Sequence, residues 1–111
     1  MLKIKMSSRL QDKEICQIAE HVRSFNQLKK LYKRLFHGSF RVENKRAWKS
    51  VKDGLKWQCR EKGVSNACFD ELSTWRNRTH DTAKEDLKTI LTEMGRTDIL
   101  TYCSHVFQDE N

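Results

Sequence analysis

The sequence predicts a single all-α domain built as a bundle of six helices. The 111-residue chain contains no proline and only four glycines, so few positions in it oppose a helix. Apolar residues recur every three or four positions through most of the chain, which is the period of one face of an α-helix. No long run alternates apolar and polar residues, so strands are not expected.

The first two helices are expected before residue 38. Ser8 and Gln11 have the spacing of a capping box, and the apolar residues that follow indicate a helix over about residues 10–23. A second helical pattern covers about residues 28–36. Gly38 follows it and is expected to end it, because glycine adopts the left-handed conformation that often follows a helix.

A longer helical pattern occupies the middle of the chain, over residues 42–62. Gly54 lies inside it and costs about 1 kcal/mol relative to alanine. This position is therefore a candidate for a kink or a split. Gly63 closes the segment, and Ser65 or Asn66 is expected to cap a fourth helix.

The last third of the chain contains the clearest order of helix starts and stops. The fourth helix carries Leu72 and Trp75 three residues apart on one face. After a polar break, Thr82 and Glu85 have capping-box spacing for a fifth helix over about residues 83–94. A short turn then leads into the last helix.

The turn between the last two helices has its own signals. Gly95 falls where a left-handed residue commonly ends a helix. Thr97 or Asp98 is expected to cap a final helix whose inner face extends to Phe107. In one interpretation of this turn, Asp98 caps the helix or offsets its dipole, and Arg96 is solvated.

In order and spacing, the predicted fourth to sixth helices resemble the corresponding helices of the death domain superfamily. The positions that carry the resemblance are Leu72, Trp75, Leu87, Leu91, Gly95, Arg96 and Asp98. It implies an all-α, six-helix antiparallel bundle with Greek-key connections over residues 8–107. Residues 1–7 and 108–111 are expected to be frayed tails. The long segment in the middle of the chain departs from the family, in which the third helix is short.

The inward faces of the predicted helices define a core. Its central members are expected to be Ile18, Leu31, Leu72, Trp75, Leu87 and Leu91. A domain of this length buries about two thirds of the surface that its unfolded chain exposes, so it needs no disulfide or metal ion to stabilise it. The four cysteines are scattered singly and are expected to be reduced.

Charge divides the chain into a basic and an acidic part. Residues 26–62 contain twelve Lys or Arg and three Asp or Glu, a net charge of +9. Residues 63–111 contain five Lys or Arg and nine Asp or Glu, a net charge of −4. The basic part of one copy is therefore attracted to the acidic part of another copy, or of a partner with the same layout.

The resemblance implies a function in assembly rather than in catalysis. Death domains associate homotypically through unlike surfaces, and their assemblies concentrate caspases or kinases in apoptotic and innate immune signalling. The chain is therefore expected to be a cytoplasmic adaptor that binds another death domain or a second copy. The residues expected to bind this partner are Lys29, Lys30, Lys33, Arg34, Arg76, Arg78, Arg96 and Asp98. In a second interpretation of the final turn, Arg96 and Asp98 form one docking surface with the loop at Arg76, Arg78 and His80.

Nucleic-acid binding is the alternative function. A net charge of +7, with Tyr32, Trp48 and Trp57 interleaved among lysines, is suited to contact with phosphates. The cations are mostly lysine, however, whereas arginine is the preferred reader of bases. No compact helix-turn-helix with polar readers is visible either.

No enzyme active site, cofactor or metal site is expected. The four histidines are scattered, and Cys103 and His105 are only two residues apart on one predicted helix, so they do not face one substrate. No glycine-rich phosphate loop or paired-carboxylate motif occurs. No apolar stretch has the length of a signal peptide core or a membrane span, so a membrane partner is not expected.

Overall fold

A computed structural model describes residues 9–107 of the protein, apart from the side chain of His80, and all regular structure in this range is helical. In chain order the elements are α1 (Asp12–Ala19), α2 (Phe25–Leu35), α3 (Phe40–Glu43), α4 (Lys45–Lys62), α5 (Val64–Thr79), the 3₁₀-helix η2 (His80–Thr82), α6 (Ala83–Glu93), α7 (Thr97–Tyr102) and α8 (Ser104–Phe107). The predicted all-α class is confirmed. None of these helices is long and apolar enough to cross a bilayer.

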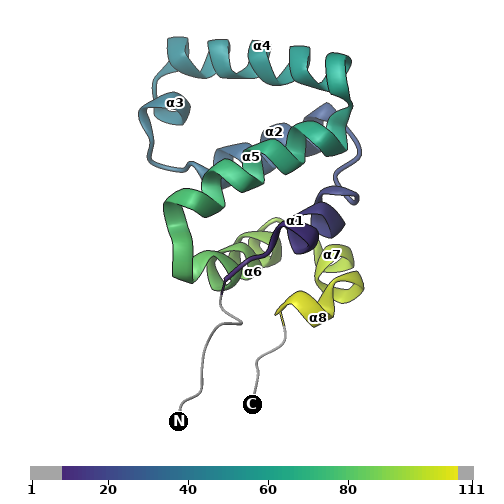
Figure 1. Ribbon diagram of the computed structural model, residues 1–111. Coiled ribbons are helices and arrows are strands. Elements are labelled where there is room, and N and C mark those ends of the chain that lie inside the picture. The colour runs from purple at the N-terminus through teal and green to yellow at the C-terminus, as the bar shows by residue number, and fades with distance from the viewer. Residues whose placement is uncertain (1–8, 108–111) are drawn as a thin grey trace.

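The helices are arranged around α5 (Figure 1). α4 lies along one end of the molecule with α3 packed against it, and α5 runs back from α4 towards the opposite end. α1 and α2 both pack on α5. α6, α7 and α8 pack on one another at the other end.

The buried face of α5 is the centre of the core. It consists of Ala67, Cys68, Leu72 and Trp75, and the helix that carries it contacts α1, α2 and α4. Each large apolar side chain buried in this way contributes about 1.5–3 kcal/mol. The six residues expected at the centre of the core, which are Ile18, Leu31, Leu72, Trp75, Leu87 and Leu91, are all buried.

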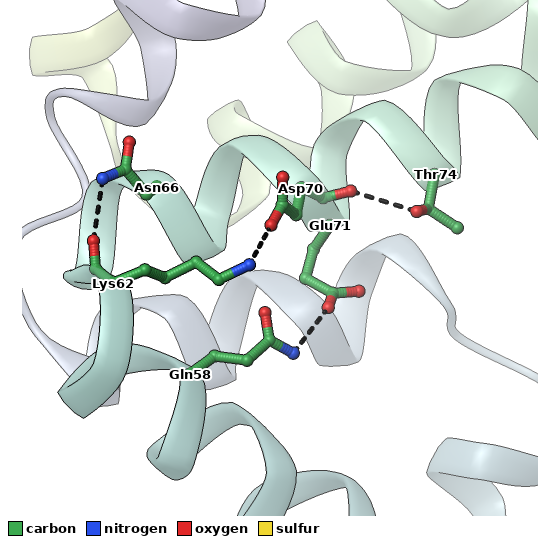
Figure 2. Close-up of polar contacts among 6 residues, drawn as sticks. All are labelled: Gln58, Lys62, Asn66, Asp70, Glu71 and Thr74. Atoms are coloured by element: carbon green, nitrogen blue, oxygen red, sulfur yellow. Dashed lines mark hydrogen bonds and ion pairs between the residues drawn. The ribbon is translucent and has the colours of Figure 1, made fainter.

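A single residue, Gly63, connects α4 to α5. Its φ of +91° lies in the region that favours glycine, and it allows the chain to reverse within one residue. Figure 2 shows the polar contacts across this hairpin. Lys62 Nζ lies 2.6 Å from a carboxylate oxygen of Asp70, and Gln58 Nε2 donates to Glu71 Oε2 at 3.3 Å. Burial raises the pKa of Glu71, so this amide contact offsets only part of the cost of burying the carboxylate.

The helix after Gly63 begins earlier than predicted. α5 starts at Val64, so both Ser65 and Asn66 lie inside it and the prediction that one of them caps the helix is wrong. The side-chain amide of Asn66 instead donates to the carbonyl of Lys62 at 2.7 Å (Figure 2). It thereby satisfies one of the carbonyl groups that the last turn of α4 leaves without a partner.

The break in the middle segment lies at Asn44 and not at Gly54. Asn44 has extended backbone angles (φ −90°, ψ 125°), and its side-chain oxygen accepts the N–H of Ala47 at 3.0 Å. It therefore ends α3 and caps α4, which then continues through Gly54. Because an N-cap contributes about 1 kcal/mol and an internal glycine costs a similar amount, the cap offsets the glycine. The predicted single helix over residues 42–62 is wrong at its start.

The first helix is shorter than predicted, covering Asp12–Ala19 rather than about residues 10–23. Glu14 caps its first turn by accepting the backbone N–H of Gln11 at 2.8 Å. The expected capping residue Ser8 lies outside the described residues. After α1, the N–H groups of His21 and Val22 bond to carbonyls three residues back, in a tighter turn that leads towards α2.

The last helices match the prediction in part. α6 has the predicted start, and Gly95 adopts the expected left-handed conformation, with φ +74°. The predicted capping box is not formed, because Thr82 ends a 3₁₀ turn and its hydroxyl donates to Asp86 at 2.9 Å. The final helix begins at Thr97 with Arg96 as its N-cap, so the prediction that Thr97 or Asp98 caps it is wrong. It divides at the buried residue Cys103. With α3 as a further addition, residues 9–107 contain eight α-helices rather than the predicted six.

Replacing Trp75 with alanine is expected to destabilise the fold by about 3–5 kcal/mol, because the side chain is only 6 % exposed in the core. A loss of this size is a large part of the stability of an ordinary domain. Urea unfolding followed by circular dichroism measures it. Trp57→Ala is the matched control, since Trp57 is 56 % exposed and should change stability by about 0.5 kcal/mol or less. Equal unfolding midpoints for the two variants would contradict the placement of Trp75.

Candidate protein-interaction surface

Three of the residues expected to bind a partner line an open groove. Lys30, Lys33 and Arg34 belong to α2, and the other walls come from α3 and α6. The groove has a volume of about 1000 Å³. The opposite face of α2 is buried in the core, so the helix turns these cations towards the groove.

The groove also has an apolar part that was not predicted from the sequence. Val42 of α3, Ile90 of α6 and Met94 just after α6 contribute to it, and all three are partly buried against the core. In the sequence, Ile90 and Met94 resemble ordinary core positions, because they share a helical stripe with Leu87 and Leu91. Their position beside a separate α3 was not predictable while that segment was expected to belong to one longer helix.

The two carboxylates that line the groove are engaged by groups of the same chain. Glu93 Oε1 lies 3.1 Å from Arg34 Nη1, and Glu43 accepts a backbone N–H of the turn before α3 at 3.2 Å. Both members of the Arg34–Glu93 pair are about half exposed, so the pair contributes about 1 kcal/mol at most. Among the described residues no ion pair includes Lys30 or Lys33. These two lysines are therefore the cations that the groove offers to a partner.

Three of the predicted partner-binding cations lie over aromatic rings. They are Lys29 over Phe25 at 5.7 Å, Lys33 over Trp48 at 5.3 Å and Arg78 over Phe36 at 5.6 Å, measured from the cation to the ring centroid. A cation–π contact at an exposed site contributes about 0.5–1 kcal/mol. This is small enough for a stronger anionic partner to compete with the ring.

Arg76 is bound within its own chain. Its Nη1 atom donates to Asp12 Oδ1 at 2.6 Å and to the backbone carbonyl of Leu10 at 3.0 Å. Only 18 % of its side chain is exposed. Arg76 therefore joins α5 to the start of α1, which is a structural role.

Arg96 is also engaged within the chain, so the expectation that it is solvated is wrong. Its guanidinium donates to both carboxylate oxygens of Asp98, at 3.0 and 2.9 Å, and to the backbone carbonyl of His21 at 2.8 Å. The hydrogen bond with Asp98 raises the pKa of Arg96, and the same contact lowers the pKa of Asp98 to about 2. The turn between α6 and α7 is thereby attached to the segment that follows α1.

The structure does not bring these two arginines together. Arg76 binds at the amino end of α1 and Arg96 binds beyond its carboxyl end. A helix of eight residues is about 12 Å long, so at least this distance separates the two attachment points. Arg78 lies elsewhere, over a ring that follows α2. A single docking surface at these residues would therefore have to extend along α1, and it stays a prediction.

The four cysteines are free thiols, and their environments differ. Burial raises the pKa of Cys68 to about 12, so this thiol stays protonated at neutral pH and is a poor nucleophile. Burial also raises the pKa of Cys59 and of Cys103. Within residues 9–107, no group of three or more His, Cys, Asp or Glu side chains is placed to hold a metal ion.

Comparisons of the chain with protein families, with curated proteins and with solved structures found no match. Its function must therefore be argued from its surfaces.

Asp98 is expected to stabilise the protein above about pH 4 and to lose this effect in acid. Its pKa falls from an ordinary value of 3.8 to about 2 on folding, so its contribution is complete above the first value and disappears as the pH falls through the second. Melting temperatures of the parent and of Asp98→Asn should therefore differ near neutral pH and converge towards pH 2. Asp53→Asn controls for the removal of another exposed carboxylate. A constant difference across this window would contradict the role assigned to the Arg96–Asp98 contact.

Proposed function

We propose that this chain is a non-enzymatic signalling adaptor of the death domain type, which assembles through homotypic contacts between unlike charged surfaces. In this proposal it acts in the cytoplasm and gathers caspases or kinases in apoptotic or innate immune signalling. The observation that carries the proposal is the division of charge, +9 over residues 26–62 and −4 over residues 63–111. The order of helices in the last third of the chain supports the choice of family.

Two surfaces of the fold take part in the proposed contact. The basic α2 surface consists of Lys30, Lys33 and Arg34 beside the groove. The acidic α6 surface consists of Asp81, Glu85 and Asp86, which are all exposed along η2 and the first turn of α6. Because the two surfaces differ, each contact leaves one of each kind unused, and the assembly grows instead of closing as a pair.

Charge alone would make such a contact weak. An exposed ion pair contributes about 0.2–1 kcal/mol, and salt reduces this further. The apolar lining of the groove, which includes Val42, Ile90 and Met94, offers surface that a partner can bury at about 25 cal/mol per Å². In the proposed mode of binding, charge sets the orientation and the rate of encounter, and the groove adds affinity.

Reversing all three residues of the basic α2 surface to Glu should abolish self-association. Neutralising the acidic α6 surface with Asp81→Asn, Glu85→Gln and Asp86→Asn should do the same. An equimolar mixture of the two triple variants should then form a 1:1 complex and nothing larger, because each chain retains one intact surface. Size-exclusion chromatography with light scattering measures these masses. Repeating it between about 50 and 500 mM salt should weaken the complex, because the contact is electrostatic.

The control for this experiment is a variant with an equal change of charge at another place. Reversing Lys45, Lys49 and Lys56, which are exposed on α4, should leave assembly intact. Because all of these side chains are exposed, each change should alter stability by about 0.5 kcal/mol or less, which thermal melts can check. The proposal would be contradicted if the basic-surface variant assembled alone. It would also be contradicted if the mixture stayed monomeric while the parent assembled.

A further inference from the structure

The outer face of α4 carries a line of cations that the proposed assembly does not use. Its members recur every three or four residues, which places them on one face of the helix. They are Lys45, Lys49, Lys52, Lys56 and Arg60, here called the α4 stripe. From the first to the last, the stripe extends over about 22 Å at 1.5 Å per residue.

The stripe faces away from the core. The side of α4 that packs on α2 and α5 holds the buried residue Leu55 and the partly buried Trp48 and Val51. Lys52, the member of the stripe nearest this side, is half-buried, and the other four members are exposed. α4 itself lies at one end of the molecule (Figure 1), so nothing in the described chain covers its outer face. One acid lies beside the stripe: Asp53 is 3.5 Å from Lys49, and both side chains are about 70 % exposed, so solvent screens this pair strongly.

Next to the stripe, α4 exposes a large aromatic ring. Trp57 directly follows Lys56 and is 56 % exposed, although the other two tryptophans of the chain are buried or half-buried. On a helix of 3.6 residues per turn, Trp57 lies beside the stripe, on the edge occupied by Arg60. A flat apolar ring therefore adjoins a regular row of positive charges.

We propose that the outer face of α4 binds single-stranded nucleic acid, with the stripe contacting successive phosphates and Trp57 stacking on a base. A row of cations at regular intervals is complementary to a polymer with regularly spaced anions. An exposed ring beside such a row is the arrangement by which proteins bind single strands without sequence preference. Because four of the five cations are lysines, which act as point charges, the contacts suit the backbone and not base edges.

The other polyanions fit this face less well. An anionic membrane surface is bound by helices that insert an apolar face, and α4 has only Trp57 beside its stripe. A duplex offers phosphates but no unstacked base for the ring. The proposal does not depend on homotypic assembly, because it uses different residues on a different helix.

Fluorescence anisotropy with a labelled oligothymidylate of about 20 nucleotides tests the proposal, with the salt concentration varied between about 50 and 200 mM. If four or five cations contact phosphates, the logarithm of the affinity should fall with the logarithm of salt with a slope of about −3. The triple variant Lys45→Gln, Lys49→Gln and Lys56→Gln should reduce that slope by about 2 and weaken binding at low salt at least about tenfold. The matched control, Lys30→Gln, Lys33→Gln and Arg34→Gln, removes the same charge from α2 and should keep most of the affinity.

A second pair of variants tests the stacking contact. Trp57→Ala should weaken binding of the oligothymidylate by roughly 5- to 150-fold, the range for loss of one stacked base. Phe40→Ala removes another exposed ring, on α3, and should have no effect. Three results would each overturn the proposal. They are an equal loss of oligothymidylate affinity in the two triple variants, no loss of affinity in Trp57→Ala, and competition by polyglutamate as strong as that by unlabelled oligothymidylate. Preferential binding to duplex DNA or to phosphatidylserine vesicles would overturn it in favour of that ligand.

Discussion

The packing of α5 against three other helices is the constraint on which the rest of the structure depends. Its buried face runs from Ala67 to Trp75 and meets α1, α2 and α4. Because each of these helices must turn an apolar side to α5, their charged sides point in different directions. The groove beside α2 and the outer face of α4 are consequently separate surfaces, although both belong to the same basic part of the chain. The single-residue turn at Gly63 makes this arrangement possible by placing α4 and α5 side by side.

Two arginines hold α1 in place, one at each end. An isolated helix of eight residues is unstable in water, so α1 depends on contacts with the rest of the chain. Its buried residues Ile15 and Ile18 supply the apolar part. Arg76 and Arg96 supply the polar part by donating to backbone carbonyls that lie outside the helix at either end. These two arginines, which the sequence presents as free cations, thus hold α1 in place. The number of cations in the sequence is therefore larger than the number available to bind a partner.

The sequence predicted the all-α class and the end of α6, because helical periodicity and a glycine in the left-handed region are local signals. The prediction from sequence was wrong where two local signals competed, as in the middle segment of the chain. Gly54 was a candidate break, but the side chain of Asn44 makes the cap that ends one helix and begins the next. The roles of Arg76 and Arg96 were not predictable for a different reason, since their acceptors at Leu10 and His21 lie 66 and 75 residues away in the chain. The groove likewise combines α2, α3 and α6, whose proximity no local pattern encodes.

The position of the positive charge also explains how the fold tolerates it. A net charge of +9 over residues 26–62 would oppose compaction if it were buried, but these cations lie mainly on the outer sides of α2 and α4, where water and salt screen their repulsion. Among the described carboxylates, Glu71 is the one whose pKa burial raises. Gln58 donates a hydrogen bond to it, and the positive charge of Arg41 acts in the opposite direction to burial. The raised pKa of Glu71 shows that these contacts do not fully compensate the lost hydration. Exposed charge therefore reduces the stability of this fold little. For the same reason, the cations on α4 can be replaced without changing the structure of the basic α2 surface.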